Sequence, residues 1–596
     1  MAVIDQLHRL ESVGLVRLAQ SQPELEYLFR HALVQDAAYQ SLLRREQRDL
    51  HRSVGELLER AHAERPEVVA LVLARHFSEA GDEPRALKYF ALAADDAARR
   101  YANDEAIMHY SRAIELARRA GPERAAELCG LYLRRGRAQE LSARDREALA
   151  GYEQLEALGR ERGDRAMELA ALVARTTLYA SAREMRDPER VQALSAQALG
   201  LARALGDRAS EIEILRDLMH DARERSQFQE AARYGEQSMA LARELGLREA
   251  LGYTLNDLSL TYMMLGQLAR AQTVRQEAAA LWRELGNQPM LSENLSYAAI
   301  TDVITGKLEA ALAGAGEARQ ISRAIGNWWG EAISLMPAAM AGLRLGNIAD
   351  ALTAMNESIR LAEQAGLAPP QVQMRADLAM VQSEMGMIQS AGEMAQLALA
   401  KAEESFPIYR LYALAALAHV YLLKGQLAEA AALVEKGIPD LEREDLFPMS
   451  RLALVITAVE LGLAQGDYGR ALFFIEMTLP MMRGMGIRYD LPVVLLLKAQ
   501  ALAGLGQPAE ARAAADEARA EAEATQARWN LQSILEWMSA QEQAAGNARE
   551  ARALRQQARE IAAYIAAHAG ASGLRESYLA LPRVRALFAP EEGDAA

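Results

Sequence analysis

The chain has 596 residues, of which 51% are apolar and 6% aromatic, and its 67 basic and 81 acidic side chains leave a formal net charge of −14. One hydrophobic core cannot serve a chain of this length, so several domains or a repeat array are expected. The negative charge disfavours general binding to nucleic acid or to an anionic membrane surface. A single cysteine, Cys129, excludes an intramolecular disulfide and a cysteine-based zinc site. With neither a signal peptide nor a long apolar segment evident, we expect a cytoplasmic protein.

The first 65 residues predict a helix, a hairpin and two further helices. The stretch AVIDQLHRLESVG predicts a helix that ends at Gly14, and LVRLA and LEYLFR predict two strands around the turn QSQPE. Helices follow over about residues 31–43 and 45–60. Helix, hairpin and helix in this order are typical of the end of a winged-helix fold, so we interpret residues 1–65 as a winged-helix remnant with a linker helix.

The helix after the hairpin places His31 on one face with Val34, Ala38 and Leu42. We therefore expect His31 to point toward an apolar seam. Residues 66–142 then predict irregular helical pairs, and the regular pattern begins near residue 143.

From residue 143 to about residue 570 the sequence repeats with a period of about 40 residues. A Gly-x-x-x-x-Ala hexapeptide starts at Gly266, Gly306, Gly346, Gly386, Gly425, Gly466, Gly506 and Gly546. Weaker copies in the same register start at Ser226 and Arg186, and a more distant one lies near residues 143–148. A small residue stands twelve positions after each start from Arg186 onward, at Ala198, Ser238, Ala278, Ala318, Ser358, Ala398, Gly437, Thr478, Ala518 and Ala558. Each copy predicts a helix, a tight turn at the glycine, and a second helix that nests on the first through small residues.

This pattern resembles the tetratricopeptide repeat, which carries the same turn glycine, the alanine five residues later and a second small residue seven after that. The resemblance covers roughly residues 70–565, with repeats about six residues longer than the usual 34. It implies an all-α fold, a right-handed tetratricopeptide-like α-solenoid of antiparallel helix pairs. We expect a capping helix and tail over residues 571–596.

The resemblance also implies a concave wall lined by the first helix of each pair, which would bind a partner. The implied wall residues are Tyr253, Asn256, Met263, Met264, Ile300, Met336, Met340, Arg344, Met380, Tyr412 and His419. A methionine-rich wall suits an amphipathic helix or an extended peptide. The alternative is that these methionines only fill the core. Trp328 and Trp329 likewise either anchor a partner or pack between repeats.

Both ends of the chain carry a second resemblance. The segment around His31 resembles the one that follows the nucleotide-binding module of bacterial STAND-type ATPases, including those fused to class III adenylate or guanylate cyclase domains. The matching positions are Phe29, His31, Ala32, Leu33, Val34, Ala38, Tyr39, Leu42, Leu43, Arg48, Leu50 and His51. LRESYLALPRVRALF, residues 574–588, is similar to the usual end of these proteins.

The phosphate loop, the Mg²⁺ site and any cyclase domain of that family would lie before residue 1. The resemblance implies that His31 touches the phosphate of a bound nucleotide, and a packed seam histidine is the alternative.

The chain contains no phosphate-loop, zinc-protease, nucleophile-elbow or EF-hand motif, so we expect neither an enzyme active site nor a metal or cofactor. We predict a non-catalytic helical-repeat sensor and scaffold. It would bind a protein or peptide partner and regulate a STAND ATPase or nucleotide cyclase module in signal transduction. A DNA-binding transcriptional regulator with a winged helix and an oligomerising or ligand-sensing array is the alternative, although binding to nucleic acid is not expected from the charge. A small-molecule effector is a third candidate, and no membrane association is expected.

Overall fold

The computed structural model describes residues 2–20, 26–100, 102–181, 185, 187–442, 448–570 and 572–589. These residues form thirty α-helices, four short 3-10 helices and one two-stranded sheet, so the predicted all-α class is confirmed. The chain divides into two compact units, unit 1 (residues 1–214) and unit 2 (residues 215–596). Most of the predicted turn at residues 20–24, Arg186 of an early hexapeptide copy and the tail beyond residue 589 lie outside the described residues.

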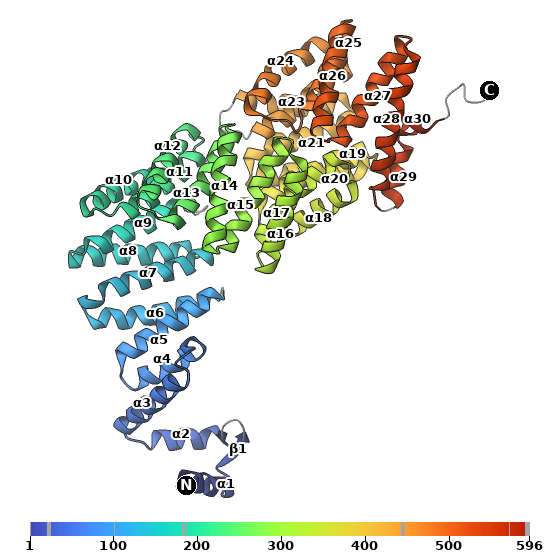
Figure 1. Ribbon diagram of the computed structural model, residues 1–596. Coiled ribbons are helices and arrows are strands. Elements are labelled where there is room, and N and C mark those ends of the chain that lie inside the picture. Colours follow the sequence, from blue (N-terminus) through green and yellow to red (C-terminus); the bar gives the residue numbers. More distant parts are fainter. Residues whose placement is uncertain are drawn as a thin grey trace. The chain divides into compact units, whose positions relative to one another are not determined.

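Unit 1 begins with a helix, a hairpin and two helices (Figure 1). These elements are α1 (Ala2–Ser12), β1 (Val16–Gln20), β2 (Glu26–Phe29), α2 (Ala32–Gln40) and α3 (Arg44–Ala61). The strands pair antiparallel with Val16 opposite Phe29, and a register shift lies between Leu18 and Gln20. The predicted order of elements is confirmed, and its assignment to a winged helix stays a prediction.

Helix α2 contains no buried residue. His31 is its N-cap and is exposed, Leu33 is 82% exposed, and Val34 is only half-buried. The expectation that His31 points toward an apolar seam is therefore wrong, because no described residue of unit 1 buries that face of the helix.

The rest of unit 1 consists of consecutive helices that pack on their neighbours. They are η1 (Pro66–Val69), α4 (Ala70–Glu79), α5 (Glu83–Arg99), α6 (Asn103–Ala120), η2 (Pro122–Arg124), α7 (Ala125–Leu141), α8 (Asp145–Arg162), α9 (Arg165–Ser181) and α10 (Pro188–Leu205). Their core begins where Phe77 stacks on Tyr89, with ring centroids 5.7 Å apart. Gly55 lets α3 approach this core, since a Cβ there would lie 3.0 Å from the Phe77 ring. The boundary between the two units lies within α11 (Arg208–Glu224).

Unit 2 continues the helix pairs with greater regularity (Figure 1). Its helices are α12 (Phe228–Glu244), α13 (Arg248–Met264), α14 (Leu268–Leu285), α15 (Gln288–Ile304), α16 (Leu308–Ala324), α17 (Trp328–Leu345), α18 (Ile348–Gln364), α19 (Ala368–Glu384), α20 (Ile388–Ser405), η3 (Pro407–Tyr409), α21 (Arg410–Leu423), α22 (Leu427–Gly437), η4 (Ile438–Glu442), α23 (Pro448–Gln465), α24 (Tyr468–Met485), α25 (Leu491–Gly504), α26 (Pro508–Ala524), α27 (Arg528–Ala544), α28 (Ala548–Ala567), α29 (Ser572–Ala580) and α30 (Pro582–Phe588). None of the helices in the described part of the chain is both long and apolar enough to span a membrane.

The repeat positions behave as the sequence predicts. The eight turn glycines from Gly266 to Gly546 have φ between 69° and 87°, a backbone conformation that glycine adopts at little cost. The alanines five residues later are all at most 3% exposed. Twelve residues after the start, Gly437 is required by space, because a Cβ there would lie 2.5 Å from Leu454 Cδ2. The chain is therefore a tetratricopeptide-like α-solenoid whose helices approach closely at these small residues.

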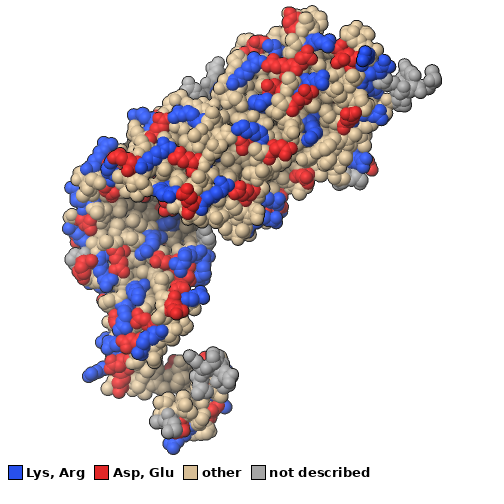
Figure 2. Space-filling model, viewed as in Figure 1, with Lys and Arg blue, Asp and Glu red and all other residues tan. Residues whose placement is uncertain are grey.

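Exposed ion pairs link successive repeats of unit 2 at a spacing of 34 residues. Arg243 Nη2 lies 2.6 Å from Glu277 Oε2, and Arg283 Nη2 lies 2.8 Å from Glu317 Oε1. Figure 2 shows basic and acidic side chains interspersed over the visible face of unit 2. Such pairs contribute little stability each, because water screens them.

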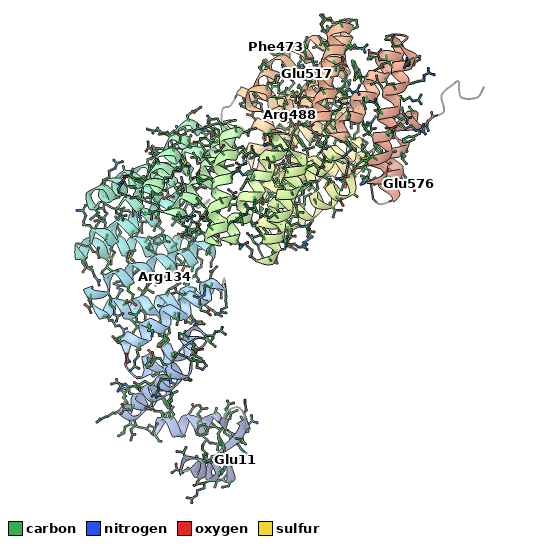
Figure 3. The ribbon with its side chains drawn as sticks, in the orientation of Figure 1. Glu11, Arg134, Phe473, Arg488, Glu517 and Glu576 are labelled. Atoms are coloured by element: carbon green, nitrogen blue, oxygen red, sulfur yellow. The ribbon has the colours of Figure 1, made fainter. Side chains whose placement is uncertain are left out.

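The array of unit 2 bends until repeats far apart in sequence meet. The segment between α24 and α25, which contains the labelled Arg488 of Figure 3, reaches α15. The backbone N–H of Arg488 donates to the carbonyl of Ile304 over 2.8 Å, and Tyr489 N–H donates to the same oxygen over 3.2 Å. Further along, the Tyr564 hydroxyl donates to Asn347 Oδ1 over 3.0 Å. Contacts over such sequence separations partly enclose the inner face of the solenoid.

Candidate functional site

Two cavities large enough for a ligand lie on the inner face of unit 2, within the described residues. The larger, of about 970 Å³, is lined by the first helices α17, α19, α21, α23, α25 and α27. We name it the acidic cavity, after Glu384, Glu460, Asp490 and Glu536 in its lining. The smaller, of about 190 Å³, is lined mainly by α13, α15, α17, α19 and η3; we name it the apolar cavity.

The apolar cavity gathers most of the predicted wall residues. Its lining includes Met263, Met264, Ile300, Met336, Met340 and Tyr412, which all belong to the predicted wall, together with Tyr297, Trp329, Phe406 and Tyr409. The methionines come from helices of two different repeats, and their part in binding a partner stays a prediction. Methionine and aromatic side chains make a surface that adapts to apolar ligands.

A buried polar cluster contributes side chains to the lining of both cavities. Arg344 Nη2 lies 2.6 Å from Asp490 Oδ1, and its guanidinium lies over the Tyr489 ring at 4.2 Å. The Tyr412 hydroxyl donates to Asp377 Oδ1 over 2.5 Å. Tyr412 lines the apolar cavity whereas Arg344 and Asp490 line the acidic one, so the cluster connects both. Burial raises the pKa of Asp377 to about 7, against the opposing effects of the Tyr412 hydrogen bond and of Arg344.

His419 is the charged centre of the acidic cavity. Its Nδ1 lies 2.9 Å from Glu460 Oε2 and its Nε2 lies 3.9 Å from Glu384 Oε1. Burial alone would lower the pKa of His419, but Glu460 and Glu384 outweigh burial and raise this pKa to about 9. The imidazole is therefore protonated at neutral pH. Glu384 Oε2 also accepts a hydrogen bond from Trp529 Nε1 over 2.8 Å.

The remaining predicted residues divide between the acidic cavity and sites elsewhere. Arg344, Met380 and His419 line the acidic cavity. Tyr253 and Asn256 instead pack on Trp282, the ring of Tyr253 at a centroid distance of 5.0 Å and Asn256 Oδ1 as the acceptor of the indole N–H at 3.3 Å.

Of the two neighbouring tryptophans, Trp329 lines the apolar cavity while Trp328 is 57% exposed. The interpretation that both pack between repeats is thus wrong for Trp328. His31 lies in unit 1, and its role in nucleotide sensing stays a prediction.

Sequence reasoning missed the C-terminal half of the site. Trp529 and Trp537 line the acidic cavity from α27, and Asp490 lines it from the segment before α25, where Tyr489 lies under the Arg344 guanidinium. The tryptophans lie eight residues apart on a first helix, a spacing that keeps them near one face, and this pattern could have indicated them. No local pattern indicates Asp490, because its partner Arg344 is 146 residues away.

The lining of the acidic cavity mixes polar and apolar side chains. Among the described residues, no group of three histidine, cysteine or acidic side chains has the arrangement to hold a metal ion. Charged groups and neutral polar side chains, among them Ser383, Gln500 and Asn530, stand in an otherwise apolar wall, a composition typical of ligand pockets.

No protein-family profile and no curated protein sequence matches this chain. Solved structures of other helical-repeat proteins are similar in architecture. A STAND protein with a tetratricopeptide repeat sensor from Pyrococcus horikoshii aligns over 74% of this chain with 14% identity and a TM-score of 0.43. This chain spans only 60% of the length of that protein.

A Rap protein complexed with competence and sporulation factor aligns over 60% of this chain and 99% of its own, with 13% identity and a TM-score of 0.47. Aspartyl phosphate phosphatase F from Bacillus subtilis aligns over 61% of this chain and 93% of its own, with 14% identity and a TM-score of 0.41. The assignment of the fold rests on the repeat geometry of this chain.

Proposed function

We propose that the protein is a non-catalytic helical-repeat sensor whose unit 2 binds a peptide, or a peptide segment of a partner protein, on its inner face. The observation that supports this most strongly is the acidic cavity, about 970 Å³ in volume and lined by the first helices of six consecutive repeats. A solenoid presents such a surface for binding, since each repeat contributes one helix to it.

The cavity-filling variant Leu496→Trp tests this function. A random-peptide library panned on the immobilised full chain enriches peptides that bind the parent chain and lose affinity for this variant. Glu517→Gln, an exposed position on α26 labelled in Figure 3, is the matched control and retains binding. Enriched peptides that bind Leu496→Trp as tightly as the parent chain would contradict the proposed site.

We further propose that the sensor regulates a STAND ATPase or nucleotide cyclase module, either upstream or in trans. The match of twelve positions around His31 to the STAND segment supports this, as does the similarity of residues 574–588 to the end of those proteins. The purified chain should show no turnover with magnesium and ATP. Hydrolysis or cyclisation of ATP that survives stringent repurification would contradict a purely regulatory role.

A further inference from the structure

The acidic cavity carries an excess of negative charge even with His419 protonated. Its lining contains four carboxylates, Glu384, Glu460, Asp490 and Glu536, and three basic groups, Arg344, His419 and Arg583. Arg344 pairs with Asp490 at 2.6 Å, Arg583 with Glu536 at 3.6 Å, and His419 with Glu460 at 2.9 Å. Glu384 is the fourth carboxylate. Its nearest basic partner is His419, whose Nε2 lies 3.9 Å from Glu384 Oε1.

Buried polar atoms in the same lining lack hydrogen-bond partners. His419 and Asn530 are only 6% and 7% exposed, and both line the acidic cavity. His419 Nε2 and Asn530 Oδ1 have no partner within the described residues. Buried polar groups in folded proteins are nearly always hydrogen-bonded, so these two atoms indicate a ligand that supplies an acceptor to one and a donor to the other.

A peptide backbone meets both requirements with a carbonyl for the protonated His419 and an N–H for Asn530. A bare ammonium ion has no acceptor to offer His419. A phosphate or a carboxylate would be repelled, because the lining already carries more negative than positive groups.

The walls around these groups are apolar. Helices α21 and α23 contribute Leu422 and Ile456, and helices α25 and α27 contribute Val493, Leu496 and Trp537. The volume of about 970 Å³ is at the upper end of the ligand pockets of roughly 300–1,000 Å³ found in proteins. The occupant is thus larger than a single amino acid side chain and mostly apolar.

We infer that the acidic cavity binds an apolar peptide segment bearing one positive charge, whose ammonium or guanidinium group lies at Glu384 while its backbone bonds to His419 and Asn530. This deepens the proposed function and rests on it, because it names the chemistry of the peptide that unit 2 takes. The excess negative charge of the cavity selects against acidic and phosphorylated segments. The apolar walls bury the apolar side chains of the peptide.

Three short labelled peptides test the inference by fluorescence anisotropy with the full chain. They share one apolar sequence and differ at a single position, which is lysine, the neutral isostere norleucine, or glutamate. The lysine peptide should bind at least about tenfold tighter than the norleucine peptide, and the glutamate peptide should bind most weakly. Glu384→Gln keeps the acceptor for Trp529, so it should remove the preference for the lysine peptide over the norleucine peptide.

Glu517→Gln is the matched control, because Glu517 pairs with Arg483 on an exposed surface and should leave the lysine preference intact. Equal, saturable binding of all three peptides would overturn the cationic specificity and leave peptide binding itself in place. A lysine preference that survives Glu384→Gln would overturn the assignment to Glu384. Absence of saturable binding for all three, together with a peptide library that enriches nothing dependent on Leu496, would overturn both the inference and the proposed function.

Discussion

The N-terminal elements of unit 1 and the repeat array of unit 2 differ in how far their apolar side chains are buried. In residues 3–20 and 26–43, Val16 is the one buried side chain, while Leu33 and Leu43 are 82% and 70% exposed. In the array, Trp282 and Tyr262 are at most 1% exposed. An apolar helix face is buried only where a neighbour covers it, and each repeat provides that neighbour for the next.

The largest expected effect compares a buried with an exposed apolar side chain. Trp282→Ala should lower the free energy of unfolding of unit 2 by about 4 kcal/mol, because it opens a cavity in a close-packed interior. All five tryptophans, at positions 282, 328, 329, 529 and 537, belong to unit 2, so urea unfolding followed by tryptophan fluorescence reports on unit 2 alone.

Leu33→Ala in α2 is the control for the other region. It should change the midpoint of unfolding, measured by circular dichroism, by the equivalent of less than about 0.5 kcal/mol. A large loss of stability in this variant would mean that α2 has a packing partner in solution.

The next effect concerns the polar cluster that lines both cavities. Asp490→Asn should lower the free energy of unfolding of unit 2 by about 3 kcal/mol, because it leaves the buried Arg344 guanidinium without its charged partner. The double variant Arg344→Met, Asp490→Asn should recover most of that loss, as a double-mutant cycle would measure. A single variant as stable as the parent would mean that the cluster is hydrated in solution.

The stability of unit 2 should fall as the pH rises from about 6.5 to 9. The pKa of His419 is about 9 in the folded chain against an ordinary 6.5, so the folded state holds this proton more tightly. The resulting stabilisation is fully present below pH 6.5 and is lost as the pH rises through 9. We expect the difference in the free energy of unfolding between the parent chain and His419→Gln to be larger at pH 6.5 than at pH 9, by on the order of 2 kcal/mol.

Urea unfolding of both chains at the two pH values measures this difference. The pKa of Asp377 is raised to about 7, so this carboxyl loses its own stabilisation as the pH rises toward 7, and the subtraction of the two chains removes that contribution. Parallel pH profiles of the two chains would contradict the ion pairs of His419 with Glu460 and Glu384.

The smallest effect lies on the outer surface of the array. Glu277→Gln breaks the exposed pair with Arg243, in which the two side chains are 37% and 47% exposed, and should cost less than about 0.5 kcal/mol. The same urea unfolding experiment measures it. A loss as large as that of Asp490→Asn would mean that outer and inner ion pairs of the array do not differ.

Much of the fold could be predicted from the sequence because the repeat positions depend on local geometry. Gly266 and its counterparts occupy left-handed turns, and Ala271 and Ala278 are fully buried between helices, as the spacing predicts. The wall residues were predicted less completely. Met263 and Met336 line a cavity, but Tyr253 and Asn256, earlier on the same helix as Met263, pack on Trp282 of the next helix.

The sequence by itself determined the period, the helix pairs and the residues that let them nest, because each of these depends on contacts within about 40 residues. Only the tertiary structure decided that the inner face is partly enclosed and that Arg344 meets Asp490 and Trp529 meets Glu384. Those partners lie about 145 residues apart, and their meeting depends on small rotations from repeat to repeat that add up along the array. The sequence of a single repeat does not encode the accumulated rotation, so no local pattern predicts the acidic cavity.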